Sequence, residues 1–481
     1  MFNEEERKAF EEFSKPEISK DLNWIKLSNI TEAIDEEGYI SFSLPNREEY
    51  RMKLTRSEFS DENNFVYAAQ REEEDGEPTG DDLVIVNVGG YISASIQVGD
   101  EFFRIIPITP ETQILVKARP EMPNWCGTPD IESQATQAAE CKMDNKSCTI
   151  KIMYVIDIDS ETKTFLSKNS IISLCKLWTE ELNTTLKNSD VKHKFEQVWI
   201  EFLDKPMAFI NDDCRVSSFQ KEYITNTNSP VYIARQQSEA DIVIFLTTRN
   251  SHFAYCQREG KAFTIGAKNS NEAFAIVKLD AAVQWLTVVH ETGHLMGGRH
   301  EDDNDAPPAK AHQFYVKSEL KRTMMFGDKT YGARIKYFSN PNVKLGGTPT
   351  GEVDKFNACV IQNQGCITAG LVADNKCAFT LGGVFDKACN PTKLDLNILG
   401  TPLNCLNSAY TYTFEYSIDG KTFTKSCSAK SSKCTINLSS NPKNYIVFVR
   451  VLISISTSSN PLQQSIDKVY SSFSVTGCKS N

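Results

Sequence analysis

The chain has 481 residues, of which 40% are hydrophobic and 24% charged, a composition typical of a globular protein with about two to four domains. Its formal net charge of -11 argues against nucleic acid or an anionic membrane as the main partner, because both bind basic surfaces. No run of about eighteen apolar residues occurs, so no membrane span is predicted.

Fourteen cysteines are present, and several lie in closely spaced pairs. No Cys-x-x-Cys spacing occurs, so the pairs indicate disulfides rather than metal knuckles, and the spacing leaves their connectivity open. The pairs are Cys141 and Cys148, Cys359 and Cys366, Cys377 and Cys389, and Cys427 and Cys434. Possible glycosylation acceptors are Asn29, Asn145, Asn183 and Asn437. We expect a secreted or extracellular protein, although the charged N-terminus shows no signal peptide.

Residues 1 to about 120 alternate short apolar runs with Gly, Asn and Asp turns, a pattern that predicts antiparallel β structure. From about residue 149 the pattern changes to strands separated by an amphipathic stretch with helical spacing, SIISLCKLWTEELNTTL. The segment 350–371 is predicted to be a closing helix. Beyond it, YTYTFEYSIDGKTFTKSC has an Asp-Gly turn between alternating runs, which indicates a hairpin.

These segments predict an α+β multidomain protein. We expect a β-rich domain over residues 1–130, a linker or activation region over 131–148, an α/β domain over 149–372, and a disulfide-stapled β-sandwich over 373–481.

The segment VVHETGHLMGGRH, residues 288–300, holds three of the six histidines in the chain. His290 and His294 lie four residues apart, so both imidazoles project from one face of a helix and can bind one ion. Asp280 is placed to cap this helix at its start. The two glycines that follow the helix allow the chain to turn back and deliver His300 to the same ion.

Three neutral imidazoles leave one position of a tetrahedral zinc site open for water, which is the arrangement of a catalytic site. Zinc lowers the pKa of a bound water from about 15.7 towards about 7. Glu291, next to His290, is placed to take the proton of that water as general base. The sequence therefore predicts Zn²⁺ as cofactor and peptide hydrolysis as the reaction.

Two alternatives compete with this assignment. HExxH arises by chance in many chains, but the full HExxHxxGxxH pattern lowers the chance rate by about two to three orders of magnitude. In the other alternative Glu319 is the third ligand, as a glutamate is in thermolysin-like enzymes. That arrangement leaves Gly297 and His300 without a role.

At HExxHxxGxxH the chain resembles the metzincin clan of zinc endopeptidases, and RTMMFGDKTYGARIKYFSNPNV (322–343) is similar to the methionine turn of reprolysin (adamalysin)-like members. The resemblance covers roughly residues 149–371. It implies a catalytic domain with a twisted mixed sheet and long helices, and it places Met325 beneath the metal, with Met324 as the alternative.

The resemblance has departures. Reprolysins usually carry Asp after the third histidine, whereas this chain has Glu301, as astacins do. The position of the metal-binding Tyr of astacins is Gly327 here, so no fifth protein ligand is expected.

Cys126, in PNWCGTPD, resembles the cysteine switch of metzincin zymogens, whose sulfur binds the zinc and keeps the enzyme latent. The alternative is an ordinary disulfide. If Cys126 binds zinc, an odd number of cysteines remains, and Cys175 on an apolar face is the natural buried thiol. His193, His252 and His312 are expected to be surface or hydrogen-bonded side chains.

The sequence thus predicts a secreted zinc endopeptidase that acts on proteins or peptides and is inhibited by its own prodomain. The competing class is a secreted binding or adhesion protein that retains a metal site with little turnover. The intact Glu291 favours the enzyme.

Overall fold

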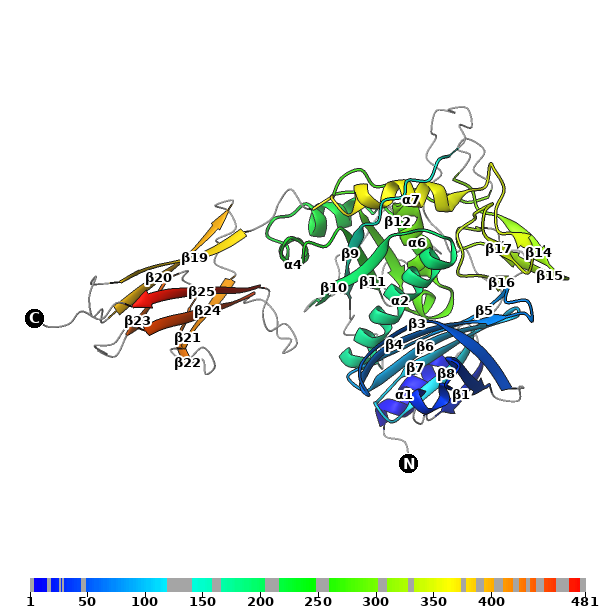
Figure 1. Ribbon diagram of the computed structural model, residues 1–481, viewed down its shortest axis with the longest axis horizontal. Coiled ribbons are helices and arrows are strands. Elements are labelled where there is room, and N and C mark those ends of the chain that lie inside the picture. The colour runs from blue at the N-terminus through cyan, green and yellow to red at the C-terminus, as the bar shows by residue number, and fades with distance from the viewer. Residues whose placement is uncertain are drawn as a thin grey trace, which may run out of the picture. The chain divides into compact units, whose positions relative to one another are not determined.

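The computed structural model divides the chain into two compact units, one formed by residues 1–235 and 240–371 and the other by 236–239 and 372–481. Each is described by itself (Figure 1). The structure describes residues 4–14, 19–25, 27, 30–44, 49–118, 141–157, 166–203, 216–247, 259–301, 309–327 and 333–372, and seven strands beyond them.

The N-terminal part is an antiparallel sheet of eight strands, preceded by helix α1 (Glu4–Phe13). In spatial order the strands are β1 (Ser19–Ile25), β8 (Gln113–Ala118), β7 (Glu101–Pro107), β6 (Tyr91–Val98), β5 (Pro78–Val88), β4 (Asn64–Glu72), β3 (Glu49–Asp61) and β2 (Tyr39–Ser43). From β2 to β8, strands that follow one another in sequence pair as hairpins, as the alternating runs and polar turns predict, and β1 pairs with β8.

The part that follows contains a five-stranded sheet with helices on its faces. Its order is β10 (Lys194–Phe202), β9 (Thr149–Ile156), β11 (Ile242–Thr247), β13 (Phe274–Lys278) and β12 (Gly260–Ala262). The first four strands are parallel, and β12 is an antiparallel edge strand. The mixed sheet with helices agrees with the expectation from the resemblance.

The main helices of this part are α2 (Lys168–Asn188), α4 (Pro230–Ser238), α5 (Leu279–Gln284), α6 (Thr287–Leu295) and α7 (Asn357–Thr368). Shorter elements are η1 (Ile30–Ala33) in the N-terminal part, α3 (Ser217–Phe219) and η2 (Gln220–Ile224). Small sheets are formed by β14 (Gln313–Val316), β15 (Glu319–Arg322) and β16 (Ala333–Arg334), and by β17 (Lys344–Leu345) and β18 (Thr348–Pro349).

The helix predicted to begin near Asp280 is two helices, which corrects the sequence expectation. α5 ends before Trp285, and the next residue, Leu286, has a positive φ of 57° that breaks the helix before α6 begins. The Thr287 hydroxyl donates to the Ala281 carbonyl at 3.1 Å and bridges the break. Asp280 lies in the first turn of α5 and does not cap the histidine helix, because the tertiary fold sets where each helix starts.

Two disulfides join the segment before β9 to α7: Cys141 to Cys359, and Cys148 to Cys366. The closely spaced cysteines are therefore bonded, but not to each other. Seven residues of helix rise about 10.5 Å, which is too far for Cys359 to reach Cys366. Residues 141–148, expected to be linker, are thereby fixed to α7.

Two further side chains bear on the sequence predictions. Cys175 is buried and forms no disulfide, as predicted. Asn183, a possible glycosylation acceptor, is instead buried in α2, where its amide bonds the backbone of Phe195 at 2.7 and 3.1 Å. The folded chain cannot carry a glycan there.

The second unit has a three-stranded sheet, β19 (Ala378–Phe385), β20 (Lys393–Thr401) and β23 (Lys433–Asn437), and a four-stranded sheet, β22 (Thr424–Ala429), β21 (Tyr410–Ser417), β24 (Tyr445–Ile455) and β25 (Asp467–Val475). β21 and β22 form the hairpin predicted around the Asp-Gly turn. The side chains of its cysteines lie outside what the structure describes, so the disulfide staples there stay a prediction.

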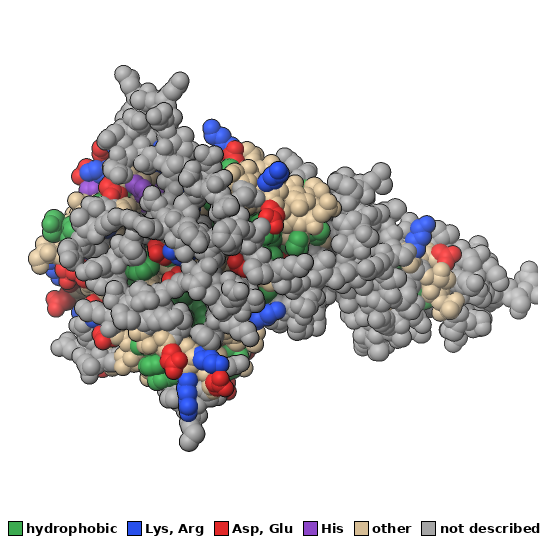
Figure 2. Space-filling view, turned by 180° about the vertical axis from the view of Figure 1, so that it is seen from behind, with side chains coloured by type: hydrophobic (Ala, Val, Ile, Leu, Met, Phe, Trp, Pro, Cys, Tyr) green, Lys and Arg blue, Asp and Glu red, His purple; other side chains and the backbone are tan. Residues whose placement is uncertain are grey.

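Within the described part of the chain, no helix is both long and apolar enough to cross a membrane. On the face drawn in Figure 2, the described acidic and basic side chains are interspersed.

Candidate metal centre

Three histidines converge at the end of α6. His290 and His294 project from this helix one turn apart, and Gly297, with φ of +92°, ends the helix and turns the chain back. His300 follows the turn. The three Nε2 atoms lie 3.1 Å from one another. The structure therefore brings together the three histidines that the sequence predicts as ligands.

The tautomers of two of these histidines are set by backbone carbonyls. His290 Nδ1 donates to the Met324 carbonyl and His294 Nδ1 to the Gly298 carbonyl, both at 2.9 Å. Because a carbonyl only accepts, each Nε2 presents a lone pair to the centre of the cluster. Burial, together with the neighbouring histidines and arginines, lowers the pKa of both imidazoles well below the usual value. Neutral imidazoles are the form that binds a metal.

These residues fit zinc. A tetrahedral ion with bonds of about 2.0–2.1 Å separates its nitrogen ligands by roughly 3.3 Å, close to the observed spacing. Lone pairs at this separation repel one another unless a cation lies among them. The described ligand set has three members, which leaves one tetrahedral position for water or substrate.

Glu291 follows His290 in α6, and the edge strand β12 holds its carboxylate. The Ala262 backbone N–H donates to Glu291 Oε2 at 2.7 Å. Gly260, two residues earlier, permits this approach, because a Cβ there would lie 2.6 Å from Glu291 Oε1. The strand β12 thus orients the carboxylate of Glu291. Its residues Gly260 and Ala262 were not identified from the sequence.

The turn that contains Met324 and Met325 lies beneath α6, and both side chains are fully buried. Met325 packs so closely under Gly293 that a Cβ on this glycine would lie 2.3 Å from its sulfur. Met324 contributes its carbonyl to His290 instead. Met325 is therefore the methionine whose side chain packs against the histidine helix.

Gly327 and Glu301 connect the same turn to His300. A Cβ on Gly327 would lie 2.9 Å from the His300 ring, so a tyrosine at this position could not be placed without moving the ring. Glu301 Oε2 accepts a hydrogen bond from the Gly327 N–H at 2.7 Å. Glu301, which departs from the reprolysin pattern, thus links the methionine turn to the residue next to His300.

The other sequence candidates lie elsewhere. Glu319 is half exposed and pairs with the buried Lys321 at 2.7 Å, and it is not a member of the histidine group, so the thermolysin-like alternative is not supported. Cys126 and His252 lie outside the described residues. His312 is buried and packs against Phe314.

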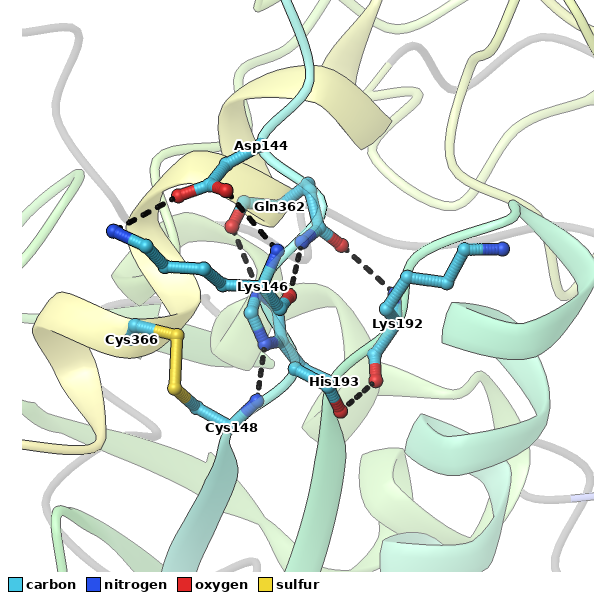
Figure 3. The surroundings of a disulfide bond; sticks show 8 residues. Asp144, Lys146, Cys148, Lys192, His193, Gln362 and Cys366 are labelled. Carbon is cyan, nitrogen blue, oxygen red and sulfur yellow. Dashed lines mark hydrogen bonds and ion pairs between the residues drawn. A yellow bond between two sulfur atoms is a disulfide. The ribbon is translucent and has the colours of Figure 1, made fainter.

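Cys148, His193 and Cys366 form a second group with the composition of a metal site (Figure 3). The two sulfurs are joined in a disulfide. His193 Nδ1 accepts from the Cys148 N–H at 3.1 Å, and its Nε2 donates to the Gln362 carbonyl at 2.6 Å. Both ring nitrogens are therefore used, so His193 is a structural histidine, as predicted.

Comparison with known proteins agrees with this geometry. Residues 175–301 match the model of the metallopeptidase family M12B, reprolysin-like. A peptidyl-Asp metalloendopeptidase of Xanthomonas campestris pv. campestris is 23% identical over 298 residues, which are 58% of this chain and 66% of that protein.

Peptidyl-Asp metalloendopeptidases of two Stenotrophomonas maltophilia strains are 25% identical over 56% and 59% of this chain, and the matches cover 66% and 68% of those proteins. The chain thus spans about two thirds of the length of these relatives. A solved structure described as a chaperone-substrate complex aligns with a TM-score of 0.36 at 15% identity, over 60% of this chain and 40% of that one.

Proposed function

We propose that this chain, which carries a reprolysin-like metzincin domain, is a secreted zinc endopeptidase that is made as a latent zymogen. The observation that carries the proposal is the cluster of three imidazole Nε2 atoms at 3.1 Å, with Glu291 next to His290 in α6. This is the set of groups that metal-assisted hydrolysis of an amide needs.

Zinc held by His290, His294 and His300 would supply acidification of a water molecule and polarisation of the scissile carbonyl. Glu291 takes a proton from the attacking water and passes it to the leaving amine. The Ala262 N–H holds Oε2 of that carboxylate, which keeps the base oriented. β12 is the edge strand of its sheet, and an extended peptide can add to such an edge by main-chain hydrogen bonds.

In the latent form the Cys126 thiolate would join His290, His294 and His300 in holding zinc, within a prodomain that spans residues 1–130. Glu291 and His290 are buried, whereas His300 is partly exposed, so access to the cluster lies on the His300 side. Activation then requires cleavage between Gly127 and Cys148 by another protease or by the enzyme itself.

The function is tested by metal content and casein digestion of the processed chain. We expect one zinc ion per chain, loss of digestion on removal by a chelator, and recovery on adding zinc. His300→Ala should lose zinc and digestion, whereas His312→Gln, outside the cluster, should lose neither. Zinc binding without any digestion would favour the binding or adhesion protein. A full zinc content in His300→Ala would contradict the ligand assignment.

We further propose that the substrate residue next to the cleaved bond is acidic. The relatives are named for peptidyl-Asp bonds. The pKa of His294 is lowered most by burial and next by His300. The positive charges of Arg299 and Arg334 lower it further, so two cationic side chains lie near the histidine cluster. The Arg334 guanidinium is fixed by donating to the Phe326 carbonyl in the methionine turn. This position suits recognition of a carboxylate.

In Arg334→Gln, the ratio of kcat/KM for an Asp-containing peptide to kcat/KM for the same peptide with Asn is expected to fall by about 10- to 100-fold. This is the effect of losing one charge-assisted hydrogen bond. Arg334→Lys should restore part of this preference. Arg71→Gln on β4 serves as control. Equal losses on both peptides would show that Arg334 only supports the turn.

A further inference from the structure

The N-terminal sheet and the metal-binding part share one hydrophobic core. Along β5, Leu83 and Ile85 belong to a core formed by the N-terminal strands alone, whereas Val84 and Val86 belong to the core that includes Leu174 of α2. α2 contacts β5, β6 and β7 on one side and β10 on the other (Figure 1). A helix buried between two sheets is an interior element, so this contact resembles the inside of a domain.

A buried arginine connects this sheet to the helix before the histidine helix. Arg104 on β7 pairs with Glu181 on α2, and both side chains are fully buried. Its Nε also donates to the Val283 carbonyl at 2.7 Å, near the C-terminus of α5. A cation is favourable at a helix C-terminus, where carbonyls lack intrahelical partners. Arg104 therefore stabilises the end of α5, from which the chain continues into α6.

A second buried pair connects the sheet to the support of the methionine turn. Lys336 pairs with Asp82 on β5, and the two side chains are 1% and 0% exposed. The next residue, Tyr337, accepts a hydrogen bond at its hydroxyl from Gln70 on β4 at 3.1 Å. The Tyr337 carbonyl accepts from the Met324 N–H at 2.7 Å. The turn beneath the histidines thus rests on a segment that the N-terminal sheet holds.

The N-terminal sheet has no disulfide to the rest of the chain. Residues 1–118 contain no cysteine. On the other side, Cys141 is already bonded to α7. After cleavage between residues 118 and 141, only the non-covalent contacts would therefore hold the sheet in place.

We propose that the N-terminal sheet is a permanent part of the catalytic unit, which stays bound after processing and holds the methionine turn and α5 in place. Separation would expose the apolar sides of β5 and α2 and leave Lys336 and Glu181 without their partners, which is strongly unfavourable. Of the proposed prodomain, residues 1–130, only the segment that carries Cys126 would then inhibit the enzyme. The proposal depends on the proposed function only where it calls this unit catalytic.

The association is tested by producing the full sequence as two chains, 1–130 and 131–481, in one cell. With an affinity tag on the first chain, we expect both to co-purify in equal amounts and to remain together on gel filtration. The expected complex binds zinc. Recovery of 131–481 alone, folded and loaded with zinc, would overturn the proposal.

The supporting role is tested in the intact chain by zinc retention. Lys336→Met leaves Asp82 buried without its partner, and we expect the melting temperature to fall by roughly 5–10 °C and zinc affinity to fall by about tenfold. Adding Asp82→Leu should restore both values. Asp35→Asn removes an exposed pair with Arg51 in the same sheet and should change neither.

The outcomes separate this proposal from the proposed function. Co-purification and rescue without peptidase activity would support the sheet as a structural part and reject the enzyme. An active 131–481 chain that needs no N-terminal sheet would support the enzyme and reject the structural role. Unchanged zinc affinity and melting temperature in Lys336→Met would also reject it, even if the two separate chains fail to fold.

Discussion

Glu291→Gln is expected to lower kcat for peptide hydrolysis by about 10²- to 10⁴-fold, the contribution of a general base. The amide has the shape of the carboxylate and its oxygen can still accept the hydrogen bond from the Ala262 N–H, so the fold and the zinc content should be unchanged. The variant therefore removes the proton acceptor and little else. The measurement is kcat on a fluorogenic peptide at equal zinc occupancy.

Glu319→Gln is the matched control. This carboxylate pairs with Lys321 away from the histidines and should be replaceable without loss of activity. If Glu291→Gln digests peptide at the parent rate, Glu291 is not the base. A loss of zinc from Glu319→Gln would instead revive the thermolysin-like ligand set.

Cys126→Ala is expected to raise the activity of the uncleaved chain on the order of a hundredfold. A thiolate of the same chain competes with water at an effective concentration of about millimolar or more, so even modest intrinsic affinity keeps the enzyme latent. Once the connecting segment has been cleaved, the variant and the parent should have equal activity. The comparison requires peptidase rates for both proteins before and after processing.

Two results would contradict this prediction. One is an uncleaved Cys126→Ala that stays as inactive as the parent, and the other is a peptide map that finds Cys126 in a disulfide. Either result would reject the cysteine switch. The N-terminal part would then inhibit the enzyme by steric blocking, or the enzyme would not be latent. Cys175→Ala is the control, because this buried thiol forms no disulfide and lies in α2.

The sequence by itself determined the chemistry of the candidate site, because that information is local. Helical periodicity places His290 and His294 one turn apart, and a glycine with positive φ lets His300 return within a few residues. The resemblance to metzincins predicts Met325 beneath the metal, and this side chain packs against Gly293 of the histidine helix. The spacing of the three histidines depends on residues near in sequence, so it can be predicted from the pattern alone.

The tertiary structure alone decided the contacts between distant segments. The Ala262 N–H that orients Glu291 comes from a strand with no motif, and the disulfides link cysteines 218 residues apart. The N-terminal sheet was expected to be a separate domain, yet Asp82 and Arg104 are buried against the metal-binding part. Buried polar residues in a strand show that a partner is needed, but only the path of the whole chain determines which residue that partner is.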